Sequence, residues 1–320
     1  MSLKLNRMLY YFLIGLVFLA GLSAPLAAKD LANIETSFDQ KEVLSLRLNQ
    51  NSGCSCQKAI APQKKSDGLG VHTTAKAAIV ADQQSGAVLF QKEPEQQLPI
   101  ASITKLMTAL VFLENNPGFD QIGQIGSGEN DLEGARLFVK DNERIKLKDL
   151  FYVSLVGSAN NATQALVHST GLTGEEFVIK MNQKAQKLGM SHTFFAEPTG
   201  LTEQNVSTAS DLVKLAKAAF NNSEIKEATT LEEYSFITEG NKEFHKVVSQ
   251  DELLKSYLDL TGTKTGFTYE AGYCLIVQSK NESGHEVIAA VLGSESSDAR
   301  FQEVKSLVSW AFENYQWELE

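Results

Sequence analysis

Segments with the pattern of β-strands lie at both ends of this chain, and segments with helical patterns lie between them. Residues 77–82 and 87–90 are apolar runs joined by a turn-like stretch, which predicts a β-hairpin. Three further strand patterns follow only after residue 230, at 262–266, 273–278 and 287–292. We therefore expect an α/β fold with one antiparallel sheet of about five strands from both chain ends, flanking helices and an inserted helical lobe.

The middle of the chain is predicted to be mainly helical. Apolar residues recur at helical spacing in five segments: 100–115, 147–155, 162–167, 174–188 and 208–220. Thr208 has the position of an N-cap, because the carboxylate of Asp211 follows three residues later. We expect short strands and loops in residues 119–148, a short strand at 234–237, and a final amphipathic helix over 301–315.

The N-terminus has the layout of an export signal. Lys4 and Arg7 precede a strongly apolar, uncharged run that extends to Ala28. Cleavage after Ala28 would put Leu26 where a small residue is preferred, and a run of about 20 uncharged residues can also span a bilayer. Residues 1–28 are thus predicted to be a signal peptide or an N-terminal membrane anchor, and either places the protein in the cell envelope.

A polar stretch separates this segment from the rest of the chain. Residues 29–73 have scattered apolar content and are predicted to be a linker with little fixed structure, which leaves 74–320 as one catalytic domain. Cys54 and Cys56 lie in the linker and offer too few ligands for a zinc site, whereas a disulfide remains open. Cys274 lies in an apolar run and is predicted to be a small core residue.

Composition excludes some classes of function. The formal net charge of −10 argues against nucleic acid as a partner, since a phosphate-binding surface should be basic. No cofactor motif and no metal-ligand spacing is evident, so zinc peptidase chemistry is disfavoured. The five histidines form neither a metal nor a triad pattern, and each is expected at the surface or in the core: His72, His168, His192, His245 and His285.

The helix that begins near residue 100 carries the first candidate for chemistry. Ser102 and Lys105 stand three residues apart at its first turn, and residues at this spacing share one face of a helix. A serine hydroxyl needs an adjacent base to act as a nucleophile at neutral pH. The pair suggests a nucleophile beside its base, although a surface Ser-x-x-Lys also occurs by chance in many chains.

Two further polar clusters lie at predicted element ends. The three clusters are Ser102-Ile103-Thr104-Lys105 at a helix start, Ser158-Ala159-Asn160 between helices, and Lys264-Thr265-Gly266 on a strand. Ser-x-x-Lys, Ser-x-Asn and Lys-Thr-Gly in this order form the signature of penicillin-binding proteins and serine β-lactamases. Each cluster alone is a weak signal, but all three in order and in fitting contexts indicate an active-serine site.

The sequence around these clusters resembles peptidase family S11, the low-molecular-mass D-alanyl-D-alanine carboxypeptidases. The resemblance covers residues from about 76 to 315 and rests on the segments 99–108, 197–201, 205–212 and 262–275, with Leu292-Gly293-Ser294, Arg300-Phe301 and Trp310 near the end. It implies a β-lactamase/transpeptidase-like fold and cell-wall substrates that end in D-Ala-D-Ala. The implied partners are peptidoglycan stem peptides and covalent β-lactam inhibitors.

The resemblance also implies roles for the first two clusters. Ser102 would attack the penultimate carbonyl and form an acyl-enzyme that water then hydrolyses. Lys105 would take the serine proton, for which it must be neutral, and burial and a nearby Lys264 would both lower its pKa. Ser158 would pass a proton toward the leaving D-Ala, and Asn160 would hold Lys105 and the substrate amide in place.

The strand cluster is implied to bind the end of the substrate. Lys264 and Thr265 would bind the terminal carboxylate. Gly266 would let the substrate backbone approach the strand closely. The backbone N–H groups of Ser102 and Phe267 would form the oxyanion hole, in which one donor contributes about 3–4 kcal/mol.

The chain departs from the family pattern in two respects. Ala159 and Asn161 stand where many members carry Gly and Asp, and we expect them to serve local packing. Many relatives have a second, all-β domain and an amphipathic anchor after the catalytic domain. Here the final helix ends in Glu318 and Glu320 and lacks a basic face, so we do not expect it to anchor the protein to a membrane.

Three alternatives to carboxypeptidase activity stay open. The single-domain layout resembles relatives that act as endopeptidases on crosslinked peptidoglycan, with the same site residues. A β-lactamase would need a second base for deacylation, and Glu197 lacks the Glu-x-x-Leu-Asn context of that base. A β-lactam sensor without turnover would need a signalling region, for which only the N-terminal segment is available.

Overall fold

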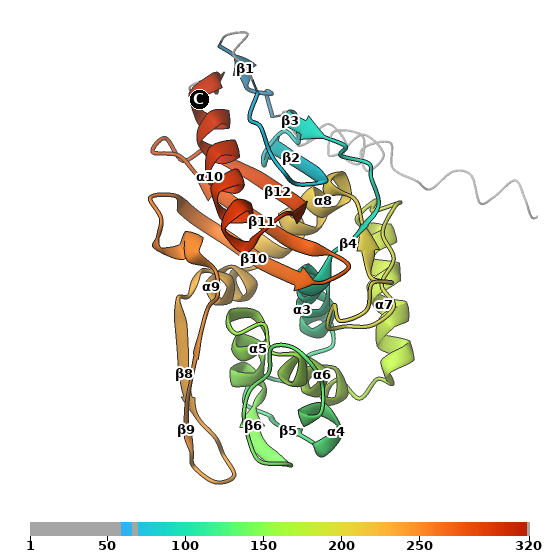
Figure 1. Cartoon of the computed structure of the whole chain (residues 1–320). Coiled ribbons are helices and arrows are strands. Elements are labelled where there is room, and N and C mark those ends of the chain that lie inside the picture. Colours follow the sequence, from blue (N-terminus) through green and yellow to red (C-terminus); the bar gives the residue numbers. More distant parts are fainter. Residues whose placement is uncertain (1–58, 66–69, 319–320) are drawn as a thin grey trace, which may run out of the picture. The chain divides into compact units, whose positions relative to one another are not determined.

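The computed structural model describes residues 59–65 and 70–318 of the chain (Figure 1). The predicted signal peptide or anchor, most of the predicted linker, and Cys54 and Cys56 lie outside these described residues. Within the described part, no helix combines the length and the apolar character that crossing a bilayer requires.

A five-stranded antiparallel sheet is built from both ends of the described chain, as the strand patterns predict. The strand order is β10-β11-β12-β2-β3, so that the N-terminal hairpin pairs with the last strand of the C-terminal meander. The strands are β2 (Ala77–Asp82), β3 (Val88–Lys92), β10 (Asp259–Thr268), β11 (Gly272–Lys280) and β12 (Glu286–Ser294). β10 is an edge strand, and only its inner edge pairs with another strand of the sheet.

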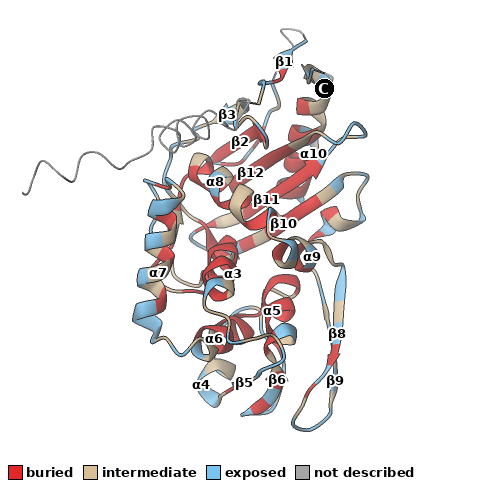
Figure 2. Cartoon of the chain, turned by 180° about the vertical axis from the view of Figure 1, so that it is seen from behind, coloured by how far each residue is buried: buried red, intermediate tan, exposed pale blue. Residues whose placement is uncertain are grey.

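Both faces of this sheet are covered, which explains why its central strands are apolar without alternation. Successive side chains of a strand point to opposite faces. Accordingly, Ala77 and Ile79 of β2 pack into the core shared with α3 (Thr104–Glu114) and α8 (Ala209–Phe220), whereas Ala78 and Val80 pack against α10 (Ser297–Asn314). Figure 1 shows α10 across one face of the sheet, and Figure 2 shows α8 on the other.

The helical lobe lies between the two halves of the sheet in the sequence. Its helices are α3, α4 (Ser127–Asn130), α5 (Leu147–Val156), α6 (Asn160–Ser169), α7 (Gly174–Lys187), α8 and α9 (Ser223–Thr230). The rings of Phe112, Phe119 and Phe151 contact one another and join α3 to α5. Thr208 caps α8 by accepting a hydrogen bond from the Asp211 N–H at 3.1 Å, as predicted.

Several short elements complete the described part. They are β1 (Gln63–Lys64), β4 (Leu98–Pro99), β5 (Ile122–Ile125), β6 (Glu143–Lys146), β7 (Val206–Ser207), β8 (Glu233–Ile237), β9 (Phe244–Val248), β13 (Tyr315–Gln316) and the 3₁₀ turns η1 (Ala101–Ile103) and η2 (Glu252–Lys255). β5 pairs with β6 in the region where short strands are expected. The predicted strand at 234–237 proves to be half of a hairpin, because β8 pairs with β9.

One boundary differs from the prediction. Residues 63–64 are assigned to the linker by composition, but they form β1 and pair with β13 at the end of α10. Thr73, also in the predicted linker, is 5% exposed. These residues are polar, so composition does not distinguish them from unstructured chain; what fixes them is pairing with the far end of the sequence.

Candidate active site

Ser102 lies in the 3₁₀ turn η1, just before α3, rather than in the first turn of the α-helix itself. The preceding residue, Ala101, has a φ of 47°, in the left-handed region that non-glycine residues rarely adopt. Lys105 is the second residue of α3 and is wholly buried. Ser102 and Lys105 therefore lie close together as predicted, but Ser102 is held in a tight turn just before the N-terminus of α3.

The amine of Lys105 has three oxygen neighbours. Its Nζ lies 3.0 Å from Ser102 Oγ, 2.7 Å from Asn160 Oδ1 and 2.6 Å from the carbonyl oxygen of Thr199. The two carbonyl oxygens can only accept hydrogen bonds, whereas a hydroxyl can donate. A neutral amine would give its two N–H groups to Asn160 and Thr199 and direct its lone pair at the serine hydroxyl.

The surroundings favour this neutral form. Burial lowers the pKa of Lys105 well below its ordinary value, and the charge of Lys264 lowers that pKa further. The carboxylate of Glu197 opposes both effects and raises the pKa, but it is the smallest of the three influences. The prediction that Lys264 depresses the pKa of Lys105 agrees with this arrangement, although burial contributes more.

The second cluster joins the first through a loop. Ser158 lies between α5 and α6 with a φ of 55°, and Lys264 Nζ donates to its Oγ at 2.9 Å. Asn160 opens α6, accepts from Lys105, and donates through Nδ2 to the Glu133 carbonyl at 2.7 Å. The side chains of Ser158 and Asn160 therefore connect the two lysines to the lobe.

Lys264 is buried, like Lys105. Its pKa is lowered to about 7, chiefly by burial, while Asp251 raises the pKa and Arg300 lowers it. Because a lysine of this kind titrates near neutrality, the charge that it offers to an anionic ligand depends on pH.

Two glycines allow the backbone of β10 and of a neighbouring loop to lie against the turn that contains Ser102. A Cβ at Gly266 would lie 2.9 Å from the Ile100 carbonyl oxygen and 3.2 Å from the Ser102 nitrogen. A Cβ at Gly200, whose φ is 87°, would lie 2.1 Å from the Ala101 carbonyl oxygen. Any side chain at either position would move the turn that carries the serine.

These groups surround one cleft of about 360 Å³. Its walls include six of the eight residues predicted for the site: Ser102, Ser158, Asn160, Thr265, Gly266 and Phe267. The other two, Lys105 and Lys264, are buried behind the walls and reach the cleft through the serines to which they are hydrogen-bonded. In the described residues, no grouping of three or more His, Cys, Asp or Glu has the geometry of a metal site.

Arg300 also lines the cleft, and motif reasoning did not select it. It is 5% exposed, and its Nη1 donates to the Gly266 carbonyl at 3.1 Å. Its Nε is buried without a hydrogen-bond partner among the described residues. Arg300 was noted in the sequence only as part of the family resemblance, and no local pattern assigned it to the site.

Glu197 organises the loop that faces Lys105. Its carboxylate accepts hydrogen bonds from the N–H groups of Thr199, Gly200 and Leu201 at 2.6, 2.5 and 2.9 Å. Asn205 joins its Nδ2 to the same carboxylate and to Thr104 Oγ1. The loop is thereby fixed with the Thr199 carbonyl toward Lys105, and the carboxylate is occupied by backbone donors rather than poised for deacylation.

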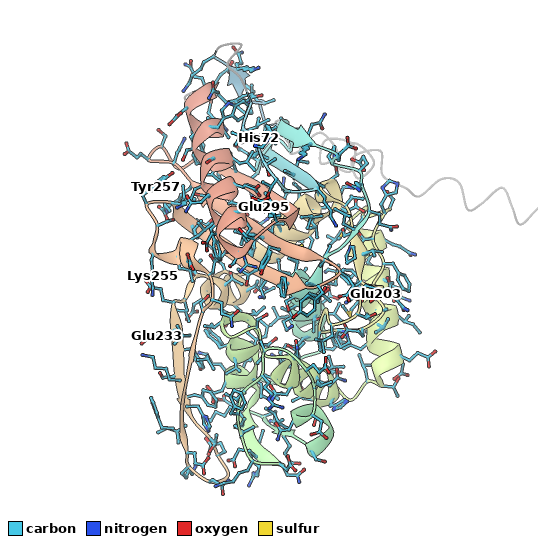
Figure 3. The ribbon with its side chains drawn as sticks, in the orientation of Figure 1. His72, Glu203, Glu233, Lys255, Tyr257 and Glu295 are labelled. Atoms are coloured by element: carbon cyan, nitrogen blue, oxygen red, sulfur yellow. The ribbon has the colours of Figure 1, made fainter. Side chains whose placement is uncertain are left out.

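Replacing Glu197 with glutamine is expected to slow acylation of Ser102 at least about tenfold. The amide nitrogen must face N–H donors in place of an acceptor, and such an unsatisfied contact costs about 1–3 kcal/mol. Loss of the negative charge should also lower the pKa of Lys105. The pH below which acylation slows should therefore move to a lower value. Glu203, exposed on the same loop and labelled in Figure 3, offers the control Glu203→Gln, which should change neither. An unshifted acid limb in Glu197→Gln would contradict this account.

Comparison with solved structures defines the class of fold. The Streptomyces K15 DD-transpeptidase is 25% identical, with a TM-score of 0.72 over 77% of this chain and 100% of that chain. A D-alanyl-D-alanine carboxypeptidase from Mycobacterium tuberculosis H37Rv is 27% identical, with a TM-score of 0.72 over 79% of this chain and 98% of that chain. The predicted β-lactamase/transpeptidase-like fold is confirmed.

The family follows from sequence. Residues 61–296 match the model of peptidase family S11, described as D-alanyl-D-alanine carboxypeptidase, and the chain belongs to this family. The carboxypeptidase DacF of Bacillus subtilis is 32% identical over 248 residues, which are 76% of this chain and 63% of that protein. A D-alanyl-D-alanine endopeptidase of Pseudomonas aeruginosa is 34% identical over 69% of this chain and 72% of that protein. The match thus spans less than two thirds of the length of DacF and more than two thirds of the length of the endopeptidase.

Proposed function

We propose that the protein is a serine-type D-Ala-D-Ala carboxypeptidase that trims peptidoglycan stem peptides. The observation that carries the proposal is the position of Lys105 Nζ, 3.0 Å from Ser102 Oγ, with its other two bonds directed at carbonyl oxygens. Membership of family S11 supports the same reaction. Action on peptidoglycan would require export, for which residues 1–28 are the proposed signal or anchor and 29–73 the spacer.

The first chemical step is acylation. Ser102 gives its proton to Lys105 and attacks the carbonyl of the penultimate D-Ala, and the N–H groups of Ser102 and Phe267 stabilise the oxyanion that forms. The proton then passes from Lys105, by way of the Ser158 hydroxyl, to the nitrogen of the leaving D-Ala; Ser158 is held in place by its hydrogen bond from Lys264. Lys105 is neutral again after this transfer and acts as the base for the water that hydrolyses the acyl-enzyme. β-Lactams would acylate Ser102 in the same way.

The terminal carboxylate of the substrate gives the site its specificity. Lys264 supplies a charge from behind Ser158, and the Thr265 hydroxyl lines the cleft beside it. We add Arg300 to this anchor, because this positively charged residue lines the same cleft. A carboxylate would find charged donors on two sides there.

The two lysines predict a bell-shaped pH dependence of kcat/KM. Lys105 must be neutral, so activity should fall as pH drops through its lowered pKa. Lys264 must be charged to attract the carboxylate, so activity should also fall as pH rises above about 7, where Lys264 loses its proton. Because Arg300 stays charged and can still attract the carboxylate, only part of the activity should be lost at alkaline pH. Steady-state kinetics with a D-Ala-D-Ala peptide between pH 5 and 10 would measure both limbs; a flat profile would contradict the assigned protonation states.

Release of free D-Ala from a short acyl-D-Ala-D-Ala peptide tests the proposed function. The wild-type protein should release one D-Ala per peptide, and Ser102→Ala should release none above background. Removal of a catalytic serine typically lowers kcat by about 10⁶-fold. Retained release by Ser102→Ala, or no release by the wild type, would sink the proposal.

Endopeptidase activity on crosslinks is the second candidate. Three relatives named D-alanyl-D-alanine endopeptidase are 32–34% identical, and the match covers 72–77% of their length against 63% of DacF. The same residues would act, with the crosslinked amine as the leaving group. This activity predicts that purified crosslinked muropeptide dimers become monomers, and dimers that stay intact after prolonged incubation would count against it.

A further inference from the structure

Three aromatic rings, two exposed and one half-buried, form a shelf at the turn between β10 and β11, and the mechanism above uses none of their side chains. The aromatic shelf consists of Phe267, Tyr269 and Tyr273. Phe267 stacks on Tyr273 with ring centroids 4.4 Å apart and meets the edge of Tyr269 at 5.7 Å. Tyr269 is 92% exposed and Phe267 is 43% exposed. Clustered, solvent-exposed rings of this kind are a feature of binding surfaces.

The shelf is continuous with the catalytic cleft. Phe267 and Thr268 line the cleft, and Tyr269 is the next residue along the chain. The guanidinium carbon of Arg300, a residue that also lines the cleft, lies 5.4 Å from the ring centroid of Tyr273. The rings thus extend the wall of the cleft outward, on a support that is itself part of the site.

The direction of a bound peptide follows from the order of groups along β10. The carboxylate anchor lies at Lys264 and Thr265, and the oxyanion donor lies at Phe267, so the substrate runs antiparallel to β10 along its unpaired edge. Extended peptides commonly add to a sheet edge in this way. With a rise of about 3.4 Å per residue, the residue that precedes D-Ala-D-Ala lies beyond Phe267, where β10 ends at Thr268 and the turn with Tyr269 begins.

We propose that the aromatic shelf binds the long aliphatic side chain of the residue that precedes D-Ala-D-Ala in the stem peptide. This inference rests on the proposed function and adds a determinant of specificity to it. The methylene groups would lie against the rings of Phe267 and Tyr269. A terminal amine on that side chain would lie near the ring face of Tyr269 and the exposed carboxylate of Glu270, both of which attract a cation.

Matched peptides and matched tyrosines test the shelf. The substrates are acyl-Lys-D-Ala-D-Ala and acyl-Ala-D-Ala-D-Ala, and the variants are Tyr269→Ala and Tyr257→Ala. Tyr257, labelled in Figure 3, is a 75% exposed tyrosine before the other end of β10. Tyr269→Ala should lower kcat/KM about fivefold for the lysine peptide and leave the alanine peptide unchanged. Tyr257→Ala should change neither.

The possible outcomes distinguish failure of the aromatic-shelf proposal from failure of the proposed function. If Tyr269→Ala lowered kcat/KM equally for both peptides, or for neither, the proposed role of the aromatic shelf would be wrong. Release of D-Ala by the wild-type protein would still support the proposed function. Absence of release from both peptides by the wild type would overturn both proposals. Because the Tyr269 side chain is almost fully exposed, its truncation is not expected to affect folding, which circular dichroism would verify.

Discussion

Replacing Lys105 with methionine should slow the acylation of Ser102 by penicillin by at least about 10³-fold. Methionine fills a similar volume, but its thioether sulfur is far too weak a base to take the serine proton. The substitution also removes the hydrogen-bond donor to Asn160 and Thr199. However, no amine then has to be buried, which offsets this loss, so the fold should persist. Intact-protein mass spectrometry would follow the adduct with time.

A second substitution provides the control for this result. Lys187→Met removes an exposed lysine of α7 and should leave the acylation rate unchanged. Circular dichroism of both variants would show whether each is folded. Acylation of a folded Lys105→Met protein within tenfold of the wild-type rate would show that another group takes the proton.

The second large effect is expected from Gly200→Ala. The new Cβ would lie 2.1 Å from the Ala101 carbonyl oxygen, so the turn that bears Ser102 would have to move. A displacement of this turn shifts both the nucleophile and an oxyanion donor, and loss of one such donor alone costs about 10²–10³ in rate. We expect acylation to fall at least about 100-fold, together with a loss of about 2–4 kcal/mol in the free energy of unfolding.

Gly284 offers a closely matched control for this substitution. Its φ of 84° is close to the 87° of Gly200, but nothing lies within 4 Å of a Cβ built there. Gly284→Ala should therefore cost only the backbone strain, about 1–2 kcal/mol by chemical denaturation, and leave acylation unchanged. Equal effects of the two substitutions on acylation would mean that contact with the Ser102 turn is unimportant.

Periodicity predicted the larger elements of the fold because each of them buries a regular face. β2, β11 and β12 each have a continuous apolar centre since helices cover both sides of the sheet, and their positions were predicted to within a few residues. α9 and β9 were missed. α9 is a short helix of mostly polar residues, and β9 is a short strand with no fully buried residue, so neither gives a strong local pattern.

Eight candidate residues for the site could be named from the sequence because three short motifs keep their order and their local context. The structure places six of them in the walls of one cleft and the two lysines behind these walls, each hydrogen-bonded to a serine. Glu197 and Arg300 were not assigned their contacts, because these depend on residues far away in the sequence. Glu197 holds the nearby Thr199, whose carbonyl faces the distant Lys105, and Arg300 contacts Gly266. Such contacts exist only once the chain has folded.

The central claim is that Ser102 is the nucleophile of an acyl-enzyme. Incubation with penicillin, followed by proteolysis and peptide mapping by mass spectrometry, tests it most directly. We predict one adduct per chain, on the peptide that contains Ser102, and none in Ser102→Ala. An adduct on the peptide that contains Ser158, or an undiminished adduct in Ser102→Ala, would contradict the claim.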